Sequence, residues 1–165
     1  MKNQKRKGFT LIELMVVVAI MGLLAALAVI SLNNARERAR DARRISDIKQ
    51  IQTALEMYYL DNHGYPTTPQ DGYPGCLEHL CISSGGTEGI DSNCSGTVYM
   101  NLTPSNPQPR GDGDCANTNY KYTVVPSSGS NTSYYIDYCL GSETGDIEAG
   151  DHHATPAGLS DGGTS

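Results

Sequence analysis

The chain has 165 residues, the size of a single domain, and contains ten tyrosines, one phenylalanine and no tryptophan. This composition predicts a modest core with amphipathic aromatic side chains. The formal net charge is −6, which argues against electrostatic binding of nucleic-acid phosphates, so we expect no nucleic-acid partner.

The first eight residues form a short basic segment. Its four positive charges and lack of acidic residues favour a cytoplasmic N-terminus. Removing residues 1–8 would take the net charge from −6 to −10. The basic residues are Lys2, Lys5, Arg6 and Lys7.

A long apolar run follows. Between Phe9 and Ile30 the only charged residue is Glu13. About 20 such residues are enough to span a bilayer as a helix. The residues after the run contain no small-residue cleavage pattern of a secretory signal peptide. We therefore predict that residues 9–32 form a transmembrane helix that is retained.

The apolar run opens with Gly8-Phe9-Thr10-Leu11-Ile12-Glu13. This pattern behind a basic leader resembles the type IV pilin and pseudopilin family. The resemblance implies that a prepilin peptidase removes residues 1–8 by cutting after Gly8, and that Phe9 is then methylated. It also implies that an inner-membrane platform and an ATPase move the subunit from membrane lipid into a helical filament of like subunits.

The presence of Glu13 needs a physical explanation, because placing a carboxylate near the start of a membrane helix costs free energy. The resemblance implies that it pairs with the free amine of Phe9 in a neighbouring subunit and fixes the axial register. The alternative is a carboxylate that only complements the dipole at the start of the helix. The complete motif favours the assembly role.

Residues 33–62 contain neither proline nor glycine and predict an amphipathic continuation of the helix. One face has a spacing of three or four and needs a sheet to cover it. We expect the arginines from Arg36 to Arg44 to form a solvated face, with contact to lipid headgroups or a neighbouring subunit as the alternative. Asn62-His63-Gly64 predicts the helix end, and Pro66 predicts an extended exit. The predicted face consists of Ala35, Ala39, Ala42, Ile45, Ile48, Gln52, Leu55 and Tyr59.

Residues 63–165 predict a globular head with a cysteine-rich loop and a flexible C-terminal tail. Alternating segments at 97–102, 119–125 and 133–140 predict a meander of about three antiparallel strands. The expected fold class is therefore α+β: a long N-terminal helix packed against a small antiparallel β-sheet, as in pilins.

The five cysteines all follow the apolar run and are disulfide candidates in an exported domain. Cys115 and Cys139 lie close to the predicted hairpin of the second and third strands, and we favour this pair. The other three allow one further pair, which the sequence does not identify. A zinc site is a weaker alternative, because structural zinc prefers more closely spaced cysteines. The remaining three are Cys76, Cys81 and Cys94.

The segment from Cys139 to His153 is rich in glycine and acidic residues. Secretion pseudopilins bind calcium in a comparable loop, so the resemblance makes calcium the one candidate cofactor, with Asp146 and Asp151 as first ligands. A solvated acidic loop is the favoured alternative. We expect His152 and His153 to be exposed and residues 157–165 to be frayed.

The residues and the resemblance together predict a structural subunit. The leading interpretation is a major or minor pilin of a type IV pilus. The alternatives are a pseudopilin of a type II secretion or competence system, which residues 45–70 favour, and a signal-anchored extracytoplasmic binding domain. Residues 63–165 contain no recognisable catalytic constellation, so we expect no enzyme. The precursor should be a single-pass protein of the cytoplasmic membrane, and the assembled form an extracellular pilus or a periplasmic pseudopilus.

Overall fold

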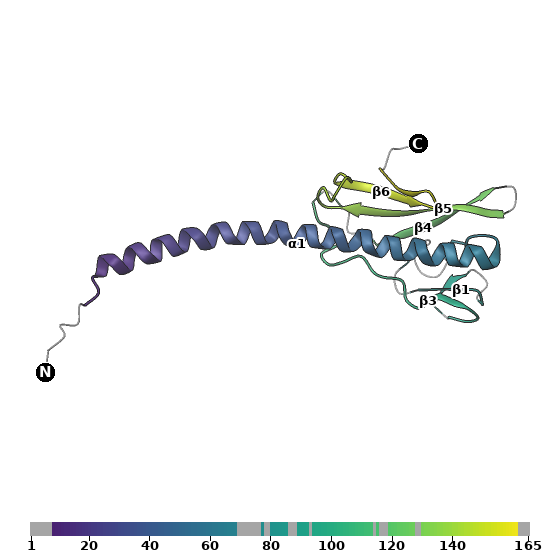
Figure 1. Ribbon diagram of the computed structural model, residues 1–165, viewed down its shortest axis with the longest axis horizontal. Coiled ribbons are helices and arrows are strands. Elements are labelled where there is room, and N and C mark those ends of the chain that lie inside the picture. The colour runs from purple at the N-terminus through teal and green to yellow at the C-terminus, as the bar shows by residue number, and fades with distance from the viewer. Residues whose placement is uncertain are drawn as a thin grey trace. The chain divides into compact units, whose positions relative to one another are not determined.

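The computed structural model describes residues 8–68, 77, 80–85, 89–92, 94–113, 115, 119–127 and 130–161. Within them it has one helix, α1 (Leu11–Asn62), and seven β-strands. The chain divides into two compact units, residues 1–36 and residues 37–165. The second unit holds the C-terminal half of α1 and all seven strands (Figure 1).

Helix α1 ends where the sequence predicts. Its last residue is Asn62, and the backbone amide of His63 donates to the carbonyl of Tyr59 at 2.9 Å. His63 adopts a left-handed conformation with φ of 57°, the conformation that commonly follows the last helical turn. His63 itself, and not the following glycine, therefore reverses the chain direction.

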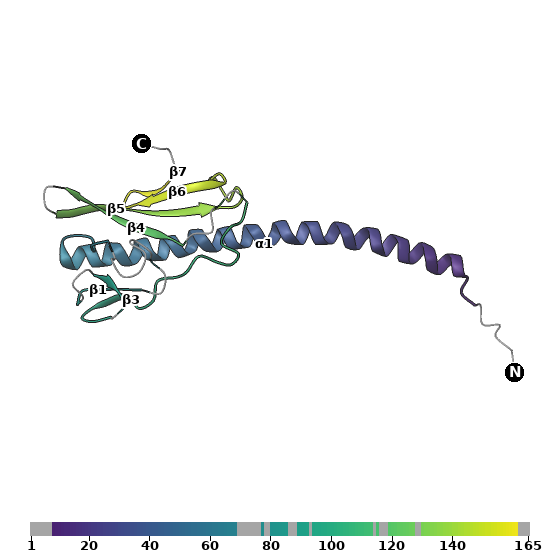
Figure 2. The same ribbon diagram turned by 180° about the vertical axis from the view of Figure 1, so that it is seen from behind.

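The strands form two antiparallel sheets. One sheet has the order β2-β1-β3 and the other the order β4-β5-β6-β7. The two sheets lie on opposite sides of the C-terminal half of α1 (Figures 1 and 2). The strands are β1 (Cys81–Ser83), β2 (Ile90–Asp91), β3 (Val98–Met100), β4 (Lys121–Ser127), β5 (Ser130–Leu140), β6 (Gly150–Thr155) and β7 (Gly158–Asp161).

The core of the second unit is built around one stripe of α1. Ile48, Ile51 and Leu55 recur every three or four residues and are fully buried. The larger sheet contributes mainly tyrosine, and the smaller sheet contributes isoleucine. The predicted α+β class, with the helix packed on antiparallel strands, is confirmed.

The prediction of the buried face of α1 is wrong at the N-terminal end of that face. Ala35, Ala39 and Ala42 are exposed, whereas Asp41 and Arg44 are buried in their place. The three alanines have the spacing of one helix face, but the polar partners in the loops determine which face of α1 is buried.

The three predicted strand segments overlap β3, β4 and β5, but these strands do not form one meander. β3 pairs with β1 in the smaller sheet, while β4 pairs with β5 in the larger one. The hairpin of β6 and β7 was not predicted, because the residues up to His153 were expected to form an acidic loop and residues 157–165 to be frayed. Their glycine-rich and polar sequence carries little of the alternation that identifies strands.

Two disulfides staple the second unit. Cys115 is bonded to Cys139, which ties the segment before β4 to the end of β5. Cys81 is bonded to Cys94, which closes the loop around β1 and β2. This bond also takes Cys81 out of the zinc alternative, and Cys76 lies outside the described residues.

A buried ionic network fixes two loops to α1. The guanidinium of Arg44 is fully buried and donates to Asp41 Oδ1 at 2.5 Å and to Asp112 Oδ2 at 3.0 Å. It also donates to Asn106 Oδ1 at 2.8 Å. Arg40 holds both oxygens of Asp112, at 2.5 and 2.8 Å.

The carboxylate of Asp41 completes this network on the other side. It accepts hydrogen bonds from the backbone amides of Gly141 and Ser142 at 3.0 and 2.9 Å, and from the Ser142 hydroxyl at 2.8 Å. The expectation of a solvated arginine face is therefore wrong for Arg40 and Arg44, whereas Arg43 stays 69% exposed. Because Asn106 and Asp112, like Gly141 and Ser142, lie far along the chain, the local sequence could not reveal these partners.

Two carboxyl groups of this region have shifted pKa values of opposite sign. Burial alone raises the pKa of Asp112, but the hydrogen bonds and charges of Arg40 and Arg44 outweigh it and hold the pKa below its ordinary value. For Asp47, burial dominates and raises the pKa, despite a hydrogen bond from the Tyr120 hydroxyl at 3.2 Å.

Candidate functional site

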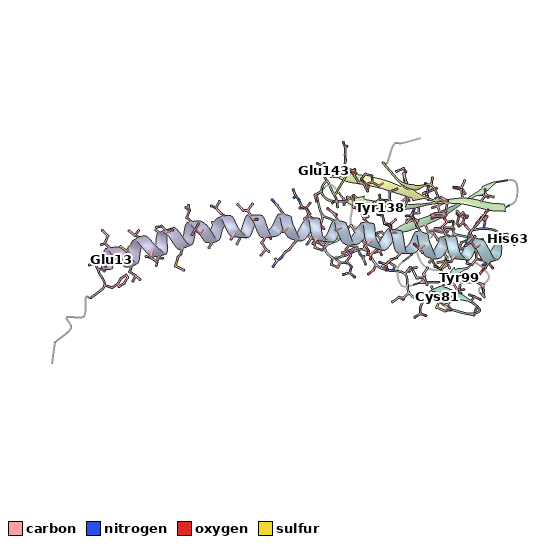
Figure 3. The ribbon with its side chains drawn as sticks, in the orientation of Figure 1. Glu13, His63, Cys81, Tyr99, Tyr138 and Glu143 are labelled. Carbon is pink, nitrogen blue, oxygen red and sulfur yellow. A yellow bond between two sulfur atoms is a disulfide. The ribbon has the colours of Figure 1, made fainter. Side chains whose placement is uncertain are left out.

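The start of α1 is organised by a reciprocal cap between Thr10 and Glu13. The Thr10 backbone amide donates to Glu13 Oε2 at 2.9 Å, and the Thr10 hydroxyl donates to the same oxygen at 2.7 Å. In return the Glu13 amide donates to Thr10 Oγ1 at 3.3 Å. This is a capping box, which satisfies amides that a helix start leaves without partners. Figure 3 shows Glu13 at this end of α1.

Sequence reasoning treated Glu13 as a helix-start carboxylate or an assembly residue and missed the cap. The signal was present, because threonine followed three residues later by glutamate before an apolar run is the capping-box pattern. The cap places the carboxylate in the first turn of α1, where the helix dipole also favours a negative charge.

The junction at Gly8 and Phe9 is open in the first unit. Gly8 is exposed, and a Cβ added to it would meet no atom within 4 Å. The Phe9 side chain is 82% exposed. Nothing in the described part of this unit therefore shields the predicted cleavage point from a peptidase.

The apolar side chains after this junction are exposed all around the helix. Leu11, Met15 and Leu23 are each about two-thirds to three-quarters exposed, and Ile30 is 63% exposed. The helix is long and apolar enough to cross a membrane, with a best 18-residue mean hydropathy of 2.8. A single chain in water would therefore expose a large apolar surface, which is energetically unfavourable.

The two calcium candidates lie in different parts of the segment between β5 and the end of β6. Asp146 is exposed in the turn closed by the bridge between Thr144 and Ile147, while Asp151 is exposed in β6 opposite Cys139. Among the described residues no three His, Cys, Asp or Glu side chains are grouped to hold a metal ion. The residues as arranged do not fit calcium, which binds six to eight oxygen ligands, and the calcium site stays a prediction.

The two histidines in this region behave differently. His153 is partly exposed, and its Nδ1 lies 2.6 Å from Asp137 Oδ1. His152 is only 3% exposed, and its Nε2 lies 2.9 Å from the carbonyl of Glu148. The expectation of exposure is therefore wrong for His152, because β6 turns this side chain inward against Tyr138.

Comparison with known proteins identifies two matching segments. The signature of the prokaryotic N-terminal methylation motif matches residues 3–29. The signature of the family described as type II secretion system (T2SS), protein G matches residues 31–132. No solved structure matches the chain significantly.

Curated relatives carry the same description. The chain is 52% identical over 105 residues to type II secretion system core protein G of Escherichia coli strain K12, across 64% of this chain and 68% of that protein. It is 49% identical over 70 residues to the protein of that name from Klebsiella michiganensis and 48% identical over 69 residues to the one from Vibrio cholerae. These two alignments cover 42% of this chain and just under half of each relative, 49% and 47%.

Proposed function

The chain belongs to the type II secretion system protein G family, and from this premise we propose that it is a pseudopilin, a structural subunit of a secretion filament. The observation that supports it most is the open Gly8–Phe9 junction, followed by a capped helix whose apolar side chains are exposed. The expected precursor is anchored in the cytoplasmic membrane by this helix, and the assembled form is a periplasmic pseudopilus.

Assembly follows from the apolar surface. Before assembly, lipid covers the side chains between Phe9 and Leu32, which are mostly more than half exposed in the single chain. In a filament, the same helices of like subunits cover one another, by close packing rather than by escape from water. Transfer between the two environments has no large hydrophobic cost, so an ATPase-driven platform can extract subunits one at a time.

The comparisons favour the pseudopilin over the type IV pilus subunit, our leading interpretation from sequence. The family match extends through the second half of α1 into β5, beyond the methylation motif that both classes share. The two disulfides staple loops that are poor in apolar residues, which a periplasmic protein needs as much as an extracellular pilus subunit does.

Mass spectrometry of the native protein tests the proposal. We expect a mature chain that begins at N-methylated Phe9 and stays with the cell envelope, and loss of type II secretion when the gene is deleted. Abundance in mechanically sheared surface material with normal secretion would favour the type IV pilus. A mature chain that begins at Met1 would overturn both.

A matched glycine pair isolates the cleavage step. Gly8→Ala should block processing, whereas Gly22→Ala should not, because a Cβ at Gly22 also meets no atom within 4 Å and lies well inside the helix. Equal processing of both variants would remove the prepilin peptidase from the proposed pathway.

A further inference from the structure

The second unit has an open pocket of about 550 Å³ that the proposed function does not use, and we call it the arginine pocket. Helix α1 contributes Arg40 and Arg43 to its lining, and the segment between β3 and β4 contributes Arg110. The same segment adds the neutral polar side chains of Ser105 and Gln108, and the described lining contains no carboxylate. The pocket therefore concentrates positive charge in a chain whose formal net charge is −6.

The buried guanidinium of Arg44 holds the loop side of this pocket in place. It donates to the backbone carbonyls of Pro109 and Arg110 at 3.1 and 3.3 Å, and to Asn106 Oδ1 at 2.8 Å. Because Arg44 is fully buried, it fixes the loop to α1 without entering the pocket lining. A ligand would therefore meet a lining whose backbone is already ordered, which lowers the entropic cost of binding.

The two arginines that α1 contributes differ in what they offer a ligand. Arg40 holds both carboxylate oxygens of Asp112 through its Nε and Nη2 atoms. Arg43 is 69% exposed, and its Nε lies 4.0 Å from Asp47 Oδ2, which is too long for a hydrogen bond. Within the described part of the chain, Arg43 therefore keeps its N–H donors for a ligand in the pocket.

We propose that the arginine pocket binds a phosphate group, carried either by the headgroup of an anionic lipid or by a soluble phosphate compound. A planar carboxylate is already matched by one guanidinium, as Arg40 and Asp112 show. A phosphate presents more acceptor oxygens, pointing in several directions, so it can accept from α1 and from the loop at once. The pocket volume also lies in the range of small-molecule sites.

This inference goes beyond the proposed filament function and does not depend on it, because the described lining lies wholly in the second unit. A lipid phosphate would give the precursor a membrane contact in addition to its apolar helix. A soluble phosphate compound would be bound whether or not the subunit is in a membrane. The two sources share the chemistry that the guanidinium groups recognise, so they are separated by experiment.

Protection of Arg43 from phenylglyoxal, which modifies accessible guanidinium groups, tests the site in the full-length chain in uncharged detergent micelles. Arg38 is the internal control, because it is also exposed on α1 but lies outside the pocket lining. The probes are inorganic phosphate and phosphatidylglycerol, with diacylglycerol as the phosphate-free lipid, all at constant ionic strength. At a probe concentration of about ten times the dissociation constant, modification of Arg43 should slow about tenfold, and that of Arg38 should not change.

A matched pair of variants tests whether the loop takes part. Arg110→Gln should weaken the protection of Arg43 by the phosphate probe about tenfold, the effect of one hydrogen bond to a charged group. Arg36→Gln removes the same charge from an exposed position of α1 outside the lining, and it should leave the protection unchanged. Thermal unfolding reports whether each variant folds, and the comparison of Arg43 with Arg38 in the wild type needs no variant.

The probes identify the source of the phosphate. Protection by phosphatidylglycerol, but by neither inorganic phosphate nor diacylglycerol, would assign the pocket to a lipid headgroup. Protection by inorganic phosphate would show that a soluble phosphate is sufficient.

Four results would overturn the site. Neither phosphate probe would protect Arg43, or Arg43 and Arg38 would be protected equally. In the third, Arg110→Gln and Arg36→Gln would weaken the protection equally, which would indicate a diffuse charge effect. In the fourth, Arg43 would become protected without any probe as the protein concentration rises, which would assign the pocket to another copy of the chain.

Discussion

Removing Arg44 should destabilise the second unit far more than removing its neighbour Arg43. The Arg44 guanidinium is fully buried and donates five hydrogen bonds, to two carboxylates, one side-chain amide and two backbone carbonyls. Arg43 has the same side chain, but it is 69% exposed and has one contact at 4.0 Å. The two leucine variants therefore separate burial from residue type.

The loss of unfolding free energy in Arg44→Leu depends on the hydrogen bonds that Asp41 and Asp112 retain. Breaking a buried ion pair from one side costs about 3–5 kcal/mol. Asp41 would still accept three hydrogen bonds from Gly141 and Ser142, and Asp112 would still be held by Arg40. Since both carboxylates retain donors, we expect the lower end, about 3 kcal/mol. Arg43→Leu should cost about 0.5 kcal/mol or less, as for an exposed pair.

Urea unfolding of the full-length chain in detergent micelles, followed by tyrosine near-UV circular dichroism, measures both free energies of unfolding. Arg44→Lys adds a further comparison, because it keeps the charge but loses the planar fork that reaches several acceptors, so it should lie between the two. If Arg44→Leu and Arg43→Leu cost the same, the network seen here does not hold the loops to α1.

Three further predictions concern the same unit. Replacing Cys115 and Cys139 together by serine should lower the free energy of unfolding by about 3 kcal/mol, measured by urea unfolding under non-reducing conditions; no change would mean that the bond is absent in the native chain. Asp47→Asn should stabilise the protein at neutral pH, because burial raises the pKa of this carboxyl and the folded state then penalises the charged form. The advantage should fade as pH falls toward about 4, the ordinary pKa of aspartate, and be absent below it, and an effect equal at pH 3 and pH 7 contradicts it. Calcium should leave the unfolding temperature unchanged, because Asp146 and Asp151 are exposed and belong to no group of three potential ligands among the described residues; a rise that disappears in Asp146→Asn with Asp151→Asn would show that they bind it.

The features that could be predicted from sequence are those that depend on residue patterns within a short stretch of the chain. The apolar run, the helix end at Asn62 and the strands containing Tyr122 and Ile136 each follow from periodicity or turn residues within a short window. The assignment of strands to sheets could not be predicted this way. β3 lies only about twenty residues before β4, yet the intervening loop carries the chain to the other side of α1.

The buried network shows a second limit of sequence patterns. Asp41 and Arg44 look like solvated surface, because charged residues are rarely fully buried unless they are paired. Their partners Asn106, Asp112 and Ser142 lie 62 to 101 residues away along the chain. Only the folded chain brings them within hydrogen-bond distance, so of this network only the pair of Asp41 and Arg44, three residues apart, is visible in the local spacing.

The cap at the start of α1 makes the role of Glu13 separable by experiment. Both hydrogen bonds from Thr10 go to Oε2 of Glu13, so Oε1 can accept the amine of a neighbouring Phe9 without breaking the cap. If assembly depends on the charge of Glu13, Glu13→Gln should fail to form filaments as completely as Glu13→Ala, although glutamine can still close a capping box. Thr10→Val, which weakens the cap by about 1 kcal/mol and keeps the carboxylate, should then assemble. Filament yield is the measurement, with processing at Gly8 checked in each variant. Assembly of Glu13→Gln at wild-type levels together with failure of Thr10→Val would reverse the conclusion and make the cap, not the charge, the feature that assembly requires.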